Sequence, residues 1–135
     1  VKQVAPMKLV KQVRAMLKTV PEKGGTATRA QIADYPVAGK TGTVHKSGSG
    51  GYAENRYMSL FAGIAPADKP EVVVVVMINE PGTQNYSGGK VAAPVFSRVT
   101  EKALRLLRVP PQVLDVSTPA QVTAAKAKVV RGRHG

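Results

Sequence analysis

The sequence predicts an α+β fold in which an antiparallel sheet of three strands is flanked by an N-terminal and a C-terminal helix. Three stretches of strand type lie near residues 37–46, 57–65 and 71–78 and follow one another with short connections, which makes them antiparallel neighbours. Apolar residues at helical spacing precede the first stretch and follow the last. We expect both helices to pack on one face of the sheet.

The first predicted helix covers residues 7–20. Pro6 suits the start of a helix, where its missing N–H costs nothing. Pro21 and the pair Gly24-Gly25 end the pattern. Apolar side chains recur along one side of this helix, and we expect them to be buried as core: Met7, Val10, Val13, Leu17 and Val20.

The first predicted strand has the sequence Val-Ala-Gly-Lys-Thr-Gly-Thr-Val-His-Lys over residues 37–46. Alternation along a strand points Lys40 to one face and both Thr41 and Thr43 to the other. An ammonium, two hydroxyls and the backbone N–H groups beside small glycines suit an anionic substrate. A P-loop is excluded, because Asp34 stands where that motif requires glycine and the strand does not lead into a helix. A plain strand with a chance K-T-G is the alternative.

The remaining elements follow from periodicity. Residues 47–55, rich in glycine and serine, predict a hairpin loop, and residues 57–65 alternate as a half-buried strand does. The continuous apolar run from Val72 to Ile78 predicts a strand covered on both faces. Pro94 opens a second helix, near residues 94–107, whose predicted buried face comprises Phe96, Val99, Ala103 and Leu106. We therefore expect one folded unit over 1–110 and a disordered basic tail over 111–135.

Composition narrows the classes of function. A formal charge of +12 favours anionic partners, so a nucleic-acid-binding module is one alternative. The basic residues are divided between two helices and the tail, aromatics make up 4%, and no nucleic-acid-binding motif is present, so we expect no nucleic acid partner. The absence of cysteine and two isolated histidines predict no metal site and no cofactor. The longest apolar run has seven residues and is too short to span a bilayer.

The motif Lys40-Thr41-Gly42-Thr43 resembles the K-T-G box of penicillin-binding proteins and serine β-lactamases. Further stretches match in the same order along the chain: 24–28, 35–39, 61–66, 86–89 and 92–96. Together they resemble the C-terminal third of the transpeptidase domain in class B penicillin-binding proteins of the cell-division type. The resemblance covers roughly Val4 to Pro111 and implies a peptidoglycan D,D-transpeptidase that works through an acyl-serine intermediate.

The resemblance also implies roles for individual residues. The Thr41 and Thr43 hydroxyls would hold the substrate carboxylate, with Gly42 between them, and the backbone N–H of Thr43 would be an oxyanion-hole donor. Lys40 would set the electrostatics of the cleft. Three further side chains would line it: His45, Tyr57 and Tyr86. Each of the three has an ordinary alternative as a surface or half-buried side chain.

The partners implied are stem peptides ending in D-Ala-D-Ala, β-lactam antibiotics, the upstream part of the same domain, and divisome proteins. The implied location is the periplasmic face of the bacterial inner membrane, with the anchor outside this chain. The family's serine motif S-x-x-K occurs only as Ser87-Gly88-Gly89-Lys90, where the glycines argue against a helix, and S-x-N does not occur. We therefore expect these 135 residues alone to be inactive. A β-lactamase or a β-lactam sensor domain is the alternative within the same superfamily.

Overall fold

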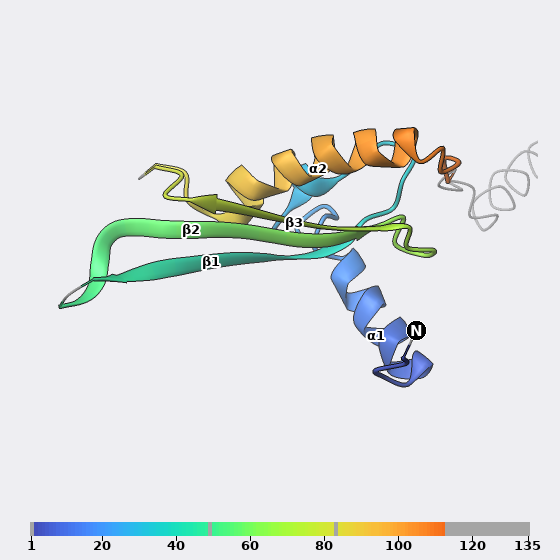
Figure 1. The fold of residues 1–135 in the computed structure, drawn as a ribbon, viewed down its shortest axis with the longest axis horizontal. Coiled ribbons are helices and arrows are strands. Elements are labelled where there is room, and N and C mark those ends of the chain that lie inside the picture. The colour runs from blue at the N-terminus through green and yellow to red at the C-terminus, as the bar shows by residue number, and fades with distance from the viewer. Residues whose placement is uncertain (1, 49, 83, 113–135) are drawn as a thin grey trace, which may run out of the picture.

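The computed structural model describes residues 2–48, 50–82 and 84–112. Along the chain the elements are helix α1 (Met7–Lys18), the 3-10 turn η1 (Thr28–Ala30), strands β1 (Ala38–Gly48), β2 (Gly51–Ala65) and β3 (Val72–Asn79), and helix α2 (Gly88–Leu106). The strands form one antiparallel sheet in the order β1-β2-β3. Figure 1 shows α2 lying along one face of this sheet. The predicted α+β fold with three antiparallel strands is confirmed.

Strand register decides which side chains share the face covered by α2. In the β1–β2 pair, Thr41 lies opposite Phe61, and Thr43 lies opposite Ser59. Residues opposite one another in an antiparallel pair project to the same face. Phe61 is fully buried and meets Phe96 of α2 edge to face, with ring centroids 4.7 Å apart. The two threonines therefore belong to the α2 face, at the edge of the described sheet.

The core lies between α2 and the central strand. A Cβ on Gly63 would come within 2.7 Å of the Phe96 ring, so this glycine lets the helix approach β2 closely. Thr100 and Leu104 are fully buried on the same side of α2. By contrast Val99 and Leu106, which the sequence pattern assigns to the buried face, are exposed. That prediction was wrong because the buried stripe of α2 runs through Phe96, Thr100 and Leu104, at intervals of one helical turn.

Helix α2 also begins earlier than the predicted start at Pro94. Ser87 is the N-cap, and Gly88, Gly89 and Lys90 are helical, so the argument that the two glycines exclude a helix was wrong. Both glycines are buried against neighbouring backbone, where any larger residue would collide. Pro94 lies inside the helix and cannot donate to the carbonyl of Lys90, which instead accepts from Arg29 Nη1 at 3.3 Å.

Helix α1 does not contribute the buried face that its periodicity predicts. Within the described structure no α1 side chain is buried, and Met7 and Val13 are among those exposed. Figure 1 shows α1 leaving the sheet on the side opposite α2, so the prediction that both helices pack on one face was wrong. The apolar side of α1 borders a groove of about 300 Å³ shared with Ile64. Its polar side is tied to the β2–β3 turn by Lys18 and Asp68, 3.0 Å apart.

Strand β3 is covered on one face only, in contrast to the prediction. Val72, Val74, Val76 and Ile78 are half-buried against the core, while the alternate side chains are exposed: Val73, Val75 and Met77. The predicted loop over 47–55 is also much shorter, because β1 runs to Gly48 and β2 starts at Gly51. Residues 113–135 lie outside the described residues, so the disordered tail stays a prediction.

Candidate functional site

The first component of the candidate site is the pair of threonine hydroxyls on β1. Thr43 is exposed, and its Oγ1 accepts a hydrogen bond from the Gly88 N–H at 3.2 Å. Thr41 Oγ1 lies 3.3 Å from the hydroxyl of Thr26, in the turn that follows α1. A hydroxyl has one donor and two acceptor positions. With Gly88 donating to it, the Thr43 oxygen keeps its own O–H available for an outside acceptor such as a carboxylate.

The start of α2 packs directly against the backbone of β1 and so fixes the position of this strand. A Cβ on Gly88 would stand 2.6 Å from the Gly42 carbonyl oxygen and 2.1 Å from that of Leu60. A Cβ on Gly89 would stand 1.9 Å from the carbonyl oxygen of Thr26. The helix start therefore touches both the K-T-G strand and the Thr26 turn. The sequence analysis includes Thr26 and Gly88 only within the matching stretches 24–28 and 86–89 and gives neither a role in the site; the paired glycines before an apolar helix were the available signal for Gly88.

Lys40 lies on the opposite side of the strand from the two threonines, as alternation predicts. Its side chain is exposed, and Nζ donates to the Thr41 carbonyl at 2.9 Å. The structure therefore brings Thr41 and Thr43 together on one face and keeps the ammonium on the other. Gly42 between them is half-buried, and a Cβ there would make ordinary contact with the Leu60 side chain at 3.4 Å.

The second component is a stack of three rings from three different segments. His45 of β1 lies against Tyr57 of β2 with centroids 4.7 Å apart, and Tyr57 lies against Tyr86 at 4.0 Å. Both pairs are inclined by only 12°, an offset-stacked type of arrangement. The backbone of Tyr86 is held in place because its carbonyl accepts from the buried Ser59 hydroxyl. His45 lies on the threonine face of β1, so the stack continues the row that begins with Thr41 and Thr43.

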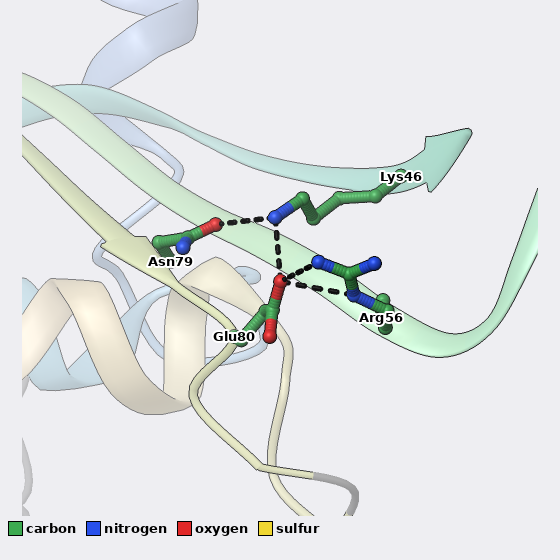
Figure 2. A network of polar contacts seen from close by, with 4 residues as sticks. All are labelled: Lys46, Arg56, Asn79 and Glu80. Carbon is green, nitrogen blue, oxygen red and sulfur yellow. Dashed lines mark hydrogen bonds and ion pairs between the residues drawn. The ribbon is translucent and has the colours of Figure 1, made fainter. Parts of the chain in front are cut away.

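The third feature is an ion-pair network whose cations adjoin His45 and Tyr57 in the sequence, and Figure 2 shows it. Glu80 Oε1 accepts from Lys46 Nζ at 2.5 Å and from Arg56 at 3.0 Å (Nε) and 2.6 Å (Nη2). Lys46 Nζ also donates to Asn79 Oδ1 at 3.0 Å. Hydrogen bonds from Lys46 and then Arg56 lower the pKa of Glu80 below its usual value. The pairing therefore persists at neutral and mildly acidic pH and is lost only as pH falls through that lowered value.

Two negative observations apply to residues 2–48, 50–82 and 84–112. No helix there has the length and apolar character needed to cross a membrane. No cluster of three or more metal-binding side chains occurs in the same part of the chain.

The fold belongs to a known class of proteins. Residues 1–101 match the family described as the penicillin binding protein transpeptidase domain, and the chain belongs to that family. Its fold resembles the transpeptidase domain of penicillin-binding protein 3 from Burkholderia pseudomallei, solved in the apo form, with a TM-score of 0.74 and 39% identity. That similarity covers 82% of this chain and 33% of the solved one.

Among curated proteins, the chain is 44% identical over 117 residues to the probable peptidoglycan D,D-transpeptidase PbpC of Pseudomonas aeruginosa. It is 35% identical over 131 residues to the peptidoglycan D,D-transpeptidase FtsI of Escherichia coli K12. These alignments cover 87% and 97% of this chain but only 21% and 22% of the relatives. The chain therefore spans about a fifth of the length of these relatives.

Proposed function

We propose that this chain forms the carboxylate-binding side and part of the oxyanion hole of a peptidoglycan D,D-transpeptidase. The observation that carries the proposal is the paired hydroxyls of Thr41 and Thr43 on an edge strand, with Thr43 oriented by the Gly88 N–H. Membership of the transpeptidase family and the printed names of its relatives support the same reaction class.

The proposed chemistry needs a nucleophile, an oxyanion hole and a holder for the substrate's terminal carboxylate. The two threonine hydroxyls donate to that carboxylate, which belongs to a stem peptide ending in D-Ala-D-Ala or to a β-lactam. The Thr43 backbone N–H is one oxyanion donor, and loss of such a donor typically slows catalysis about 10²–10³-fold. Lys40 adds positive charge beside the strand. The serine nucleophile and its lysine come from the remainder of the transpeptidase domain.

The ring stack supplies the apolar wall of the same site. In this proposal His45, Tyr57 and Tyr86 contact the part of the ligand beyond its carboxylate, since they continue the threonine row along β1. Aromatic faces bury large areas while the polar edges stay hydrated. The same proposal places the enzyme at the periplasmic face of the inner membrane, where cell-division proteins assemble on it.

The experiment is covalent labelling by a fluorescent penicillin, followed by denaturing electrophoresis. The complete protein is expected to give a labelled band that persists for hours, because a transpeptidase releases the penicilloyl group slowly. A β-lactamase would instead lose the label within seconds to minutes by hydrolysing the acyl-serine bond. A complete protein that is folded and never labelled would contradict the proposal.

The 135-residue chain alone is expected to stay unlabelled under the same conditions. It contains one S-x-x-K match, Ser87 to Lys90, which we do not assign as the nucleophile: Ser87 caps α2 and its backbone carbonyl accepts from Lys90 N–H. The matched variant is Ser87→Ala in the complete protein, which should be labelled as well as the parent. A labelled band of 14.2 kDa that disappears with Ser87→Ala would show this assignment to be wrong.

A further inference from the structure

Extending the proposed function, we propose that Glu80 is a positioning residue that anchors the chain at the end of β3 to β1 and β2 and thereby orients Tyr86 in the ring stack. Glu80 touches no part of the threonine pair. Its effect on the site passes through the aromatic rings, so it is expected to govern how well a ligand is bound before acylation.

The first support is the position of the network in the chain. Lys46 directly follows His45 and Arg56 directly precedes Tyr57, so each cation is one residue along the strand from a ring-bearing position of β1 or β2. Both cations converge on the single oxygen Oε1 of Glu80. Glu80 follows the end of β3 and opens the segment that carries Tyr86. The Glu80 carboxylate thus links β1, β2 and the chain after β3, the three parts that contribute a ring. Figure 2 shows its contacts with Lys46 and Arg56.

The second support is that the backbone is held both at Glu80 and around Tyr86. The Tyr86 carbonyl accepts from the Ser59 hydroxyl, and the Gly88 N–H donates to Thr43 Oγ1. The Glu80 N–H donates to the Tyr57 carbonyl at 2.8 Å. Glu80 has a φ of 50°, a left-handed conformation that is unfavourable for a residue with a side chain. Such a conformation persists where the surroundings hold it, and Glu80 is held by its N–H bond to Tyr57 and by ion pairs with Lys46 and Arg56.

The third support is the charge balance within the network. The chain carries a formal charge of +12, and Glu80 is the carboxylate that accepts from both Lys46 and Arg56. Without the negative charge of Glu80, Lys46 and Arg56 repel one another at close range. The chain at residue 80 then also loses its charged partners. The side chains of Glu80 and Lys46 are 40% and 25% exposed, so the effect is that of a half-exposed network and is moderate in size.

The test uses Glu80→Gln in the complete transpeptidase, since glutamine keeps the size and removes the charge. The dissociation constant of the non-covalent β-lactam complex should rise roughly 3- to 10-fold, the range that two partly exposed ion pairs support. The acylation rate constant of the bound complex should stay within about twofold, because the threonine hydroxyls are untouched. Glu101→Gln is the matched control: it removes a carboxylate that pairs with Arg105 at 2.7 Å on α2. This control should leave both constants unchanged.

A double-variant cycle separates positioning from simple electrostatics. If Glu80 acts through the ring, adding Glu80→Gln to Tyr86→Ala should produce no further loss of binding. An equal loss in both backgrounds, or tighter binding of the anionic β-lactam to Glu80→Gln, would overturn the proposal. Hydrogen exchange gives a readout that does not depend on acylation: the Gly88 amide, which donates to Thr43, should exchange faster in Glu80→Gln than in Glu101→Gln. Equal exchange would overturn the inference even if the parent were never acylated, whereas absence of acylation alone would count against the proposed function.

Discussion

Replacing Thr43 by valine in the complete transpeptidase is expected to slow acylation by a β-lactam roughly 10- to 150-fold, which corresponds to one charge-assisted hydrogen bond of about 1.5–3 kcal/mol. Valine keeps the shape and strand preference of threonine but cannot donate to the ligand carboxylate. The backbone N–H of residue 43 is unchanged, so activity should be reduced and not abolished. The measurement is the second-order acylation rate, taken well below the melting temperature.

The sequence alone suggests that this change leaves stability unaffected, but the structure adds a cost. Thr43 Oγ1 accepts from the N–H of the buried Gly88, and an N–H left without a partner costs about 1–3 kcal/mol. Thr43→Ser is the control, because serine retains the hydroxyl; it should keep most of both the rate and the stability. An acylation rate for Thr43→Val within twofold of the parent would mean that Thr43 is only a strand residue.

Gly88→Ala is expected to lower the free energy of unfolding by about 1–3 kcal/mol or more, the usual range for overpacking a close contact. The new methyl group would stand 2.1 Å and 2.6 Å from two backbone oxygens, those of Leu60 and Gly42, which cannot move aside as a side chain does. Relief requires α2 to shift away from β1, which withdraws the N–H from Thr43. Acylation should therefore fall together with stability.

The matched control is Gly50→Ala, since a Cβ there meets no atom within 4 Å. Alanine has a higher helix propensity than glycine by about 1 kcal/mol. The measured loss of unfolding free energy in Gly88→Ala is therefore smaller than the steric cost itself. Thermal denaturation and the acylation rate are both measured for the two variants. A Gly88→Ala protein more stable than the parent would contradict the close contact between α2 and the K-T-G strand.

The strands could be predicted from sequence because their signal is local. Alternation along β2 places Phe61 and Gly63 on one face of the sheet and Ile64 on the other. Short connections make neighbouring strands antiparallel. The start of α2 could not be predicted in this way. Helix propensity argues against a helix at Gly88 and Gly89, but close packing on Leu60 and Thr26 makes these residues helical. An apolar stripe, as on α1 or β3, shows that a surface favours burial. It does not show whether the covering surface belongs to the same 135 residues.

In the candidate site, too, the local features could be predicted from the sequence and the long-range contacts could not. Thr41, Thr43 and His45 share a face because a strand has a period of two, which the sequence predicts. The orientation of the Thr43 hydroxyl depends on Gly88, 45 positions further along the chain. The network around Glu80 depends on partners 24 and 34 positions away. Contacts of this kind follow from tertiary packing and leave no periodic trace in the sequence.

Strand β3 has a practical consequence for handling the chain in isolation. It lies at an edge of the described sheet and presents Val73, Val75 and Met77 to solvent at 73%, 61% and 60% exposure. An unpaired edge with an apolar, β-branched, uncharged sequence is a template for aggregation with other copies. Purified as these 135 residues alone, the chain should form oligomers or precipitate as its concentration rises. Val75→Lys should keep the preparation monomeric, because a charge on this exposed side of β3 opposes pairing with other copies while the α2 face of the sheet stays intact.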